Sequence, residues 1–218
     1  MGKEERDDFN VVQGATLTLL GLIIGFSFAM AVSRYDQRKN NEESEANAIG
    51  TEYLRCDLLP DAERSQVKQL LKKFVDQRVV FYETRDAARL EQVKQAAAQI
   101  GSEMWSAVTR GAEKRQTPAT TLVISGLNDV LNAQGYTEAT WLNRIPIAAW
   151  SLMATLAIFG CLLVGNGAHR PGGLLSMVLP LALSIAFFLI ADMDSPRGGL
   201  IRVRPQNLVS LSETLAPH

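Results

Sequence analysis

The stretch that decides the fold is VVQGATLTLLGLIIGFSFAMAV, from Val11 to Val32, because it contains no charged residue. At ~1.5 Å per residue, an α-helix of this length would measure about 33 Å and could cross a hydrocarbon core of ~30 Å. The stretch is longer than the ~7–15 apolar residues of a secretory signal peptide, and the segment before it carries acidic as well as basic residues. It therefore predicts a first transmembrane helix over residues 11–32, after a polar N-terminal segment over residues 1–10.

Two further apolar stretches lie near the other end of the chain. IPIAAWSLMATLAIFGCLLV predicts a second transmembrane helix over residues 144–165, with Pro146 in the first turn, where a helix tolerates it. LLSMVLPLALSIAFFLIA predicts a third over residues 174–191, with Pro180 as a tolerated kink. A glycine-rich turn would join the two as a hairpin. The alternative is a buried soluble hairpin, but 218 residues could hardly bury three such helices in a water-soluble core.

Basic residues at the ends of these stretches give the expected orientation, because the cytoplasmic flanks of membrane helices carry an excess of Lys and Arg. One side is flanked by Arg34, Arg38, Lys39, Arg144, Arg197, Arg202 and Arg204. The other side carries only Lys3, Arg6 and Arg170. We therefore expect a multi-pass protein of the cell inner (plasma) membrane, with residues 33–143 and the tail, residues 192–218, in the cytoplasm.

The region between the first two spans, residues 33–143, has no convincing strand pattern and predicts a bundle of helices in the cytoplasm. The first helix is expected to run out of the membrane toward Leu59, where Pro60 ends it. A second helix should begin near Asp61, because its apolar residues recur at helical spacing from there on.

Two more helices are expected in the same region. Gly111 is a plausible end for a third helix, and Thr117 followed by Pro118 is a good cap and first turn for a fourth, with Gly135 as its end. The charged residues of this region read as solvated faces or subunit contacts. They include Lys68, Lys72, Lys73, Asp76 and Arg78. The acidic run Glu42, Glu43 and Glu45 could bind a metal, but an exposed helical charge run is the commoner explanation for it.

The composition offers little for catalysis or for nucleic-acid binding. The formal net charge is −1 at pH 7, so no basic excess points to nucleic acid. The two histidines, His169 and His218, are too few and too badly placed for a zinc site or a catalytic triad. Cys56 and Cys161 are far apart in the sequence and read as ordinary reduced thiols. We therefore expect no enzyme activity, no metal and no cofactor.

The first span carries two distinctive faces. Gly14, Gly21 and Gly25 fall on one side at ~100° per residue, which would let a neighbouring helix approach closely. A second face climbs mostly by fours through Thr18, Leu22, Phe26 and Met30 and continues through the uncharged polar residues Gln37, Asn41 and Ser44. An apolar constriction followed by a polar wall suits a pore-lining helix. The alternative is that the apolar residues face lipid or protein.

Three strings in the sequence strongly resemble the bestrophin-like domain family of membrane proteins. They are GATLTLLGLIIGFSFAMAVSRYDQRKN, EANAIGTEYLRCDLLP and the tail segment DMDSPRGGLIRV. The resemblance extends over most of the chain, and the second string is its most specific part. Members of the family usually carry another apolar helix before the first of these spans, and we expect that helix to be missing from this sequence.

A more distant resemblance links GFSFAMAVSRY to the pore helix of bestrophin ion channels. It would assign the hydrophobic neck of the pore to Phe26, Leu22 and Thr18, although Thr18 departs from the apolar pattern. The segment DMDSP resembles an acidic stretch where some bestrophins bind calcium, but a wider acidic run is lacking, so no calcium site is expected. The resemblance implies a homopentamer that sits in the lipid bilayer and passes small inorganic ions. Bestrophin relatives include both anion- and cation-preferring members, so the resemblance does not give the sign of the ion.

The sequence thus predicts an all-α membrane protein with three transmembrane helices and a cytoplasmic helical bundle between spans one and two, similar to bestrophins. The function expected from the resemblance is that of a homo-oligomeric ion channel whose pore is lined by the first span. The alternative is a membrane-anchored scaffold or signalling protein whose cytoplasmic helices bind a partner and whose spans conduct nothing.

Overall fold

The computed structural model of the chain describes residues 3–167 and 175–216, and these are helical with short connections and contain no strand. The elements are α1 (Lys3–Arg55), the short 3₁₀ helix η1 (Cys56–Leu58), α2 (Asp61–Glu83), α3 (Ala87–Lys114), α4 (Pro118–Leu142), α5 (Ile147–Gly167), α6 (Leu175–Asp194) and α7 (Gln206–Leu215). The prediction of an all-α chain is confirmed. His169, Arg170, His218 and most of the predicted glycine-rich turn lie outside the described residues.

The chain divides into two compact units. One, which we call the membrane unit, consists of Met1–Tyr35 and Asn143–Ile201. The other, which we call the bundle unit, consists of Asp36–Leu142 and Arg202–His218. The long helix α1 contributes its N-terminal part to the membrane unit and its C-terminal part to the bundle unit.

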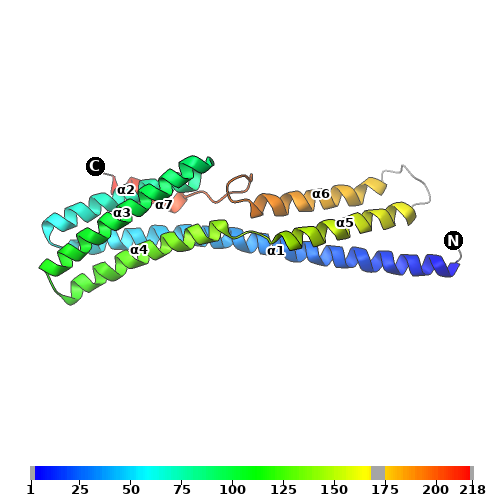
Figure 1. The fold of residues 1–218 in the computed structure, drawn as a ribbon, viewed down its shortest axis with the longest axis horizontal. Helices are drawn as coiled ribbons and strands as arrows, with labels where there is room; N and C mark the ends of the chain where they lie inside the picture. Colours follow the sequence, from blue (N-terminus) through cyan, green and yellow to red (C-terminus); the bar gives the residue numbers. More distant parts are fainter. Residues whose placement is uncertain (1–2, 168–174, 217–218) are drawn as a thin grey trace. The chain divides into compact units, whose positions relative to one another are not determined.

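Three stretches of the described helices have the length and the apolar composition needed to cross a membrane. They lie within Glu4–Leu58, Pro118–Asn166 and Met177–Asp194. In the membrane unit, α5 and α6 run alongside the N-terminal part of α1 (Figure 1). The cores of this unit consist of Ala31, Ile145, Met153, Ile190 and Met193 in one cluster and Leu20, Ala157 and Leu183 in another. α6 continues through Pro180, as expected for a membrane helix with packed neighbours.

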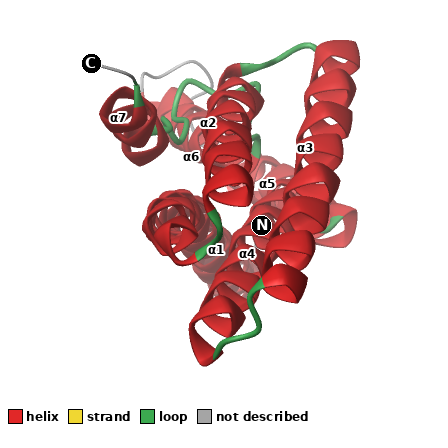
Figure 2. Cartoon of the chain, turned by 90° about the vertical axis from the view of Figure 1, so that its left-hand side faces the viewer, coloured by secondary structure: helices red, strands yellow, loops and turns green. Residues whose placement is uncertain are grey.

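In the bundle unit, α2 lies between α7 and α3, and α3 packs against α4 (Figure 2). The core includes Leu71, Phe74 and Val75 of α2, which are fully buried. α2 begins at Asp61 and α4 at Pro118, so the predicted starts of both helices are confirmed. Pro118 suits the first turn of α4 because its fixed φ is already helical and its missing N–H would lack a partner there. Pro60 lies just before α2, as its N-cap residue.

The two predicted helix ends at glycine are wrong. α3 runs past Gly111 to Lys114, and α4 runs past Gly135 to Leu142. A Cβ added at Gly111 would lie 3.0 Å from Leu59 Cδ2 and 3.3 Å from Glu63 Cβ, so this glycine permits close helix packing inside the helix. At Gly135 a Cβ would meet nothing within 4 Å in the described part of the chain, and the intact hydrogen-bonded helix continues through it.

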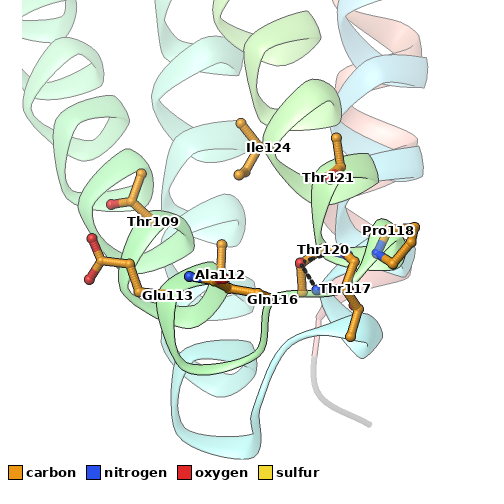
Figure 3. A pocket seen from close by; sticks show the side chains of 9 residues that line it. All are labelled: Thr109, Ala112, Glu113, Gln116, Thr117, Pro118, Thr120, Thr121 and Ile124. Carbon is orange, nitrogen blue, oxygen red and sulfur yellow. Dashed lines mark hydrogen bonds between the residues drawn. The ribbon is translucent and has the colours of Figure 1, made fainter.

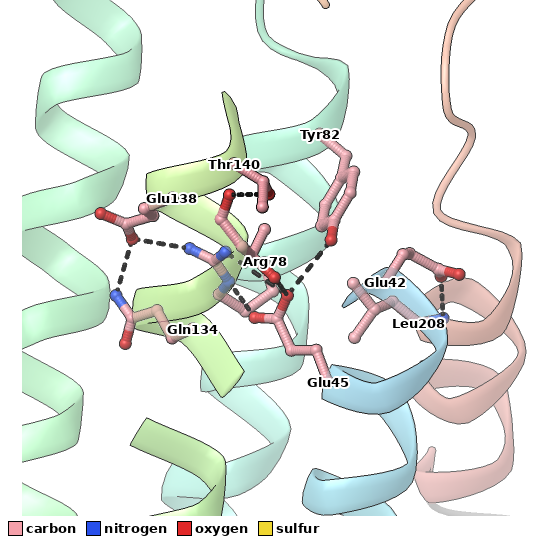
Figure 4. A network of polar contacts seen from close by, with 9 residues as sticks. Glu42, Glu45, Arg78, Tyr82, Gln134, Glu138, Thr140 and Leu208 are labelled. Atoms are coloured by element: carbon pink, nitrogen blue, oxygen red, sulfur yellow. Dashed lines mark hydrogen bonds and ion pairs between the residues drawn. The ribbon is translucent and has the colours of Figure 1, made fainter. Parts of the chain in front are cut away.

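The reading of the charged residues as solvated is wrong for three of them, because Arg78, Glu45 and Glu42 are at most 2% exposed. The Arg78 guanidinium donates to Glu45 and to Glu138 Oε1, the latter at 3.1 Å (Figure 4). The guanidinium also lies over the Phe81 ring. Burial is tolerated because each charge has an oppositely charged or hydrogen-bonding partner.

The same network reaches the neighbouring helices. Tyr82 Oη donates to Glu45 Oε2 at 3.3 Å, and Thr137 Oγ1 donates to the same oxygen at 3.0 Å. Glu42 accepts from the backbone N–H of Leu208 at 2.9 Å, in the first turn of α7. The acidic run of α1 is therefore largely a set of internal partners for α2, α4 and α7, and only Glu43 is exposed as expected.

Candidate functional site

The apolar face of α1 predicted to line a pore has no cover within the described chain. Leu22, Phe26 and Met30 are 53%, 62% and 41% exposed, while Leu20 on another face of the helix is 2% exposed. Thr18 is also exposed, and its Oγ1 donates to Gly14 O at 2.8 Å. The hydroxyl that breaks the apolar pattern is thus bonded within the helix. We call Thr18, Leu22, Phe26 and Met30 the α1 ridge.

The glycine face of α1 is equally open. A Cβ added at Gly14, Gly21 or Gly25 would meet nothing within 4 Å in the described part of the chain. The close approach that the chain itself makes to α1 is at Gly160 of α5, where a Cβ would lie 3.2 Å from Leu17 Cδ2. Gly160 was not predicted from the sequence. The spacing of glycines along α1 does not show that a neighbouring helix can supply the small residue at the contact.

The acidic segment at the end of α6 binds groups of its own unit. Asp194 forms an ion pair with Arg34 of α1 at 3.0 Å and accepts from the backbone N–H of Ile145 at 3.0 Å. Asp192 accepts from the backbone N–H groups of Leu200 and Ile201 at 2.6 Å and 2.8 Å. Both carboxylates therefore have structural roles, fixing the turn after α6 and the start of α5.

The polar continuation of the first span lies in the bundle unit and meets α4 there. Gln37 and Ser44 are exposed, and the Asn41 side-chain Nδ2 donates to Tyr136 O at 3.3 Å and to Thr140 Oγ1 at 3.0 Å. A groove of about 410 Å³ runs between the two helices, and we call it the α1–α4 groove. It is lined by Asn41, Ser44 and Ala48 of α1 and by Asp129, Asn132, Ala133 and Tyr136 of α4.

The α1 side of this groove contains two residues that the sequence singled out, Asn41 and Ser44. The α4 side was missed, and Asp129 is the main omission. Helical spacing in α4 gives its apolar face but not the neighbour that each polar face meets, so the sequence alone could not pair Asp129 with α1.

Comparison with known proteins now identifies the family. The family model described as Bestrophin-like domain matches residues 1–208 of this chain. The chain belongs to the bestrophin-like domain family. The resemblance inferred from the sequence is therefore confirmed.

Solved structures agree with the family. A crystal structure of a mutant bacterial bestrophin homologue from Klebsiella pneumoniae has a TM-score of 0.74 at 14% identity and covers 94% of this chain and 85% of its own. Another crystal structure of a homologue from this organism, phased with zinc, has a TM-score of 0.70 at 16% identity over 96% and 84% of the two chains. At such identities the likeness concerns the fold. No curated protein is significantly similar in sequence.

A buried acid lies in the bundle unit of this bestrophin-like chain. Glu52 of α1 is 0% exposed, and neither of its carboxylate oxygens has a hydrogen-bond partner among the described residues. Burial raises the pKa of Glu52 to about 8; nearby Arg55 opposes this rise and nearby Asp129 adds to it. A Cβ at Gly126 of α4 would overlap both Glu52 Oε2 and Arg55 Nη1, so the absence of a side chain there makes room for this pair.

A second, larger hollow lies at the turn between α3 and α4 (Figure 3). It measures about 720 Å³ and is lined mainly by threonine side chains and small apolar groups, with Glu113 as the one ionisable residue among those that line it. Thr117 and Thr120 bond each other's backbone N–H through their hydroxyls at 3.2 Å and 3.3 Å. These hydroxyls cap the start of α4 and form no catalytic arrangement.

The described residues contain no group of three or more His, Cys, Asp or Glu that could hold a metal ion. Cys56 is a buried thiol whose pKa burial raises to about 12, so it stays protonated.

Proposed function

We propose that the chain is the subunit of a homo-oligomeric, pentameric ion channel in the cell inner (plasma) membrane, with α1 lining the pore. The observation that carries this proposal is the exposed α1 ridge, on a helix whose buried side packs against α5 and α6. Membership of the bestrophin-like domain family and the fold shared with bacterial bestrophin homologues support it.

In this proposal the α1 ridge of each subunit faces a common axis, and each of its apolar positions forms a ring. An apolar ring disfavours water and ions unless it widens, so the ridge would act as a gate. Gln37, Asn41 and Ser44 would form the wettable wall beyond it. Gly14, Gly21 and Gly25 would let the neighbouring subunit's helix approach. Residues 33–143 and 192–218 would lie in the cytoplasm.

Replacement of Phe26 by alanine is the most direct test. Phe26→Ala should raise basal ion flux in liposomes that contain the purified oligomer, because Phe26 has the bulkiest apolar side chain of the α1 ridge and would form its narrowest ring. Phe28→Ala is the matched control, since Phe28 lies on the same helix about 200° away from Phe26 and outside the α1 ridge. Its flux should stay close to that of the unmodified protein.

Two results would count against the proposal. If the purified protein, unmodified or with Phe26→Ala, passes neither chloride nor sodium nor potassium under voltage, the scaffold alternative replaces the channel. If Phe28→Ala raises flux as much as Phe26→Ala does, α1 has a different face toward the pore. The native mass of the detergent-purified protein tests the oligomer directly, because a monomer cannot enclose a pore with one lining helix.

The proposed orientation has its own test. A cysteine introduced by Gln99→Cys should resist an impermeant thiol reagent added outside intact cells, and one introduced by Ala168→Cys should react. The opposite pattern of labelling would reverse the orientation that the basic flanking residues favour.

A further inference from the structure

The α1–α4 groove presents hydrogen-bond acceptors and one negative charge. Asn41 uses its Nδ2 as donor to Tyr136 O and Thr140 Oγ1, so the oxygen of the Asn41 amide is the atom left for the groove. Ser44 adds a hydroxyl. Among the described residues that line the groove, Asp129 is the only one charged at neutral pH, and it is 61% exposed. A wall of oxygen atoms with a carboxylate attracts cations and repels anions.

The charge of Asp129 is partly balanced by one arginine. Arg55 Nη1 lies 4.0 Å from Asp129 Oδ2, at the outer limit of an ion pair, and both side chains keep contact with solvent. At this distance and exposure the pairing is weak, so the carboxylate retains much of its field.

Arg55 also lies beside the second acid, Glu52. Both Glu52 Oε2 and Arg55 Nη1 occupy the space above Gly126, and neither carboxylate oxygen of Glu52 has a hydrogen-bond partner among the described residues. The charged groups that act on Glu52 are Arg55 from α1 and Asp129 from α4, while the adjacent Cys56 thiol stays protonated. Arg55 therefore lies near both an exposed carboxylate in the groove and a buried carboxyl group that is mostly protonated near neutral pH.

We propose that Asp129 makes the α1–α4 groove a selective site for small inorganic cations, and that Arg55 sets the strength of this selection by pairing with either Asp129 or Glu52. This inference rests on the proposed function, because it assumes that ions pass the groove. When Glu52 loses its proton in alkaline solution, it competes for Arg55 and frees Asp129. Cation preference should then rise as the pH passes through the pKa of Glu52, about 8.

The experiment measures reversal potentials of the reconstituted full chain under a sodium chloride gradient. The unmodified protein should prefer sodium to chloride, and Asp129→Asn should lower the permeability ratio by about threefold or more, because the only carboxylate of the groove is removed. Asp129→Lys should bring the ratio below that of Asp129→Asn. Asp61→Asn is the matched control, since Asp61 is an exposed acid of α2 outside the groove, and its ratio should not change.

Two further variants test the shared arginine. Arg55→Gln should raise the sodium-to-chloride ratio, because Asp129 loses its counter-charge. Glu52→Gln should abolish the rise of the ratio between pH 7 and pH 9, which the unmodified protein should show. If Asp129→Asn fails to assemble, Asn132→Asp supplies a second carboxylate in the same groove and should increase the ratio.

The outcomes separate this inference from the channel proposal. Absence of current from the unmodified protein and from Phe26→Ala overturns the proposed function. Ion currents whose reversal potential is the same for the unmodified protein, Asp129→Asn and Asn132→Asp overturn the selectivity inference and leave the channel in place. If substitution of Asp129 changes the sodium-to-chloride permeability ratio, but the ratio of the unmodified protein does not change between pH 7 and pH 9, the role of Glu52 is overturned.

Discussion

The two parts of α1 differ in how they use polar side chains. In the membrane unit, Thr16 and Thr18 donate their hydroxyls to carbonyls of their own helix at 2.8 Å, and the contacts to α5 and α6 are mainly apolar. In the bundle unit, Glu42 and Glu45 are buried and bind partners on other helices. One helix therefore packs by shape in one unit and by charge pairing in the other.

This difference has a physical cause and a consequence. In lipid, moving an apolar side chain of α1 from hydrocarbon to a protein contact gains little free energy. Small residues and close van der Waals contact therefore determine how the helices pack. In the bundle unit, a buried charge requires its partner, and loss of that partner leaves an uncompensated ion. We therefore expect the bundle unit to depend on a few charged residues and the membrane unit to depend more on fit.

The largest effect should come from Arg78. Arg78→Met should destabilise the bundle unit by about 3–5 kcal/mol, because Glu45 would be left buried without its cation. Chemical denaturation of the detergent-purified protein, followed by circular dichroism, measures the change. Lys73→Met on the exposed side of the same helix should change stability by less than about 0.5 kcal/mol. Equal stability of the two variants would contradict the view that charge pairing holds this unit together.

A smaller, pH-dependent effect should come from Glu52. Its pKa is raised by burial from the ordinary 4.5 to about 8, so the folded chain holds the proton more tightly than the unfolded chain does. The associated stability is fully present below about pH 4.5 and is lost as the pH rises through about 8. We expect a loss of about 2–4 kcal/mol, since one pKa unit corresponds to about 1.4 kcal/mol and nearby solvent reduces the full value.

Glu52→Gln provides the control for this prediction. Glutamine cannot ionise, so the free energy of unfolding of the variant should fall less between pH 5 and pH 9 than that of the unmodified protein. Denaturation midpoints at several pH values measure both. Parallel pH profiles for the two proteins would show that Glu52 is solvated and has an ordinary pKa.

The contrast between the units also explains what could be predicted from the sequence. The spans and the starts of α2 and α4 follow from apolar runs and from Pro60 and Pro118, which act locally. The buried roles of Glu45 and Arg78 could not be predicted, because the two residues are far apart in sequence and each alone resembles a solvated helix charge. Spacing along α1 singled out Asn41 and Ser44 as polar residues on one face, but the groove itself and Asp129 became visible only when α4 was placed against α1.

In the membrane unit, one charged group should matter to a lesser degree. Asp194→Asn should destabilise the unit by about 1–2 kcal/mol, because the ion pair with Arg34 is lost while the asparagine can still accept from the backbone of Ile145. Thermal unfolding in detergent measures the change. Asp36→Asn, at an exposed position of α1, is the control and should have almost no effect. A loss as large as that of Arg78→Met would remove the distinction between the two units.

The smallest effect should come from two glycines that are equally open within the chain. Gly135 lies in α4 of the bundle unit and Gly25 in α1 of the membrane unit, and a Cβ would meet nothing within 4 Å at either in the described residues. Gly135→Ala should stabilise the protein by about 0.5–1 kcal/mol, because alanine loses less backbone entropy in a helix than glycine does. Gly25→Ala should give no such gain, since the proposed neighbouring subunit would meet the added methyl group and offset it. Thermal unfolding and oligomer yield, measured on both variants, separate the cases. Equal stabilisation by the two substitutions would mean that the glycine face of α1 meets lipid. In that case the close helix packing of the membrane unit would occur only within one subunit, and no neighbouring subunit would contact this face.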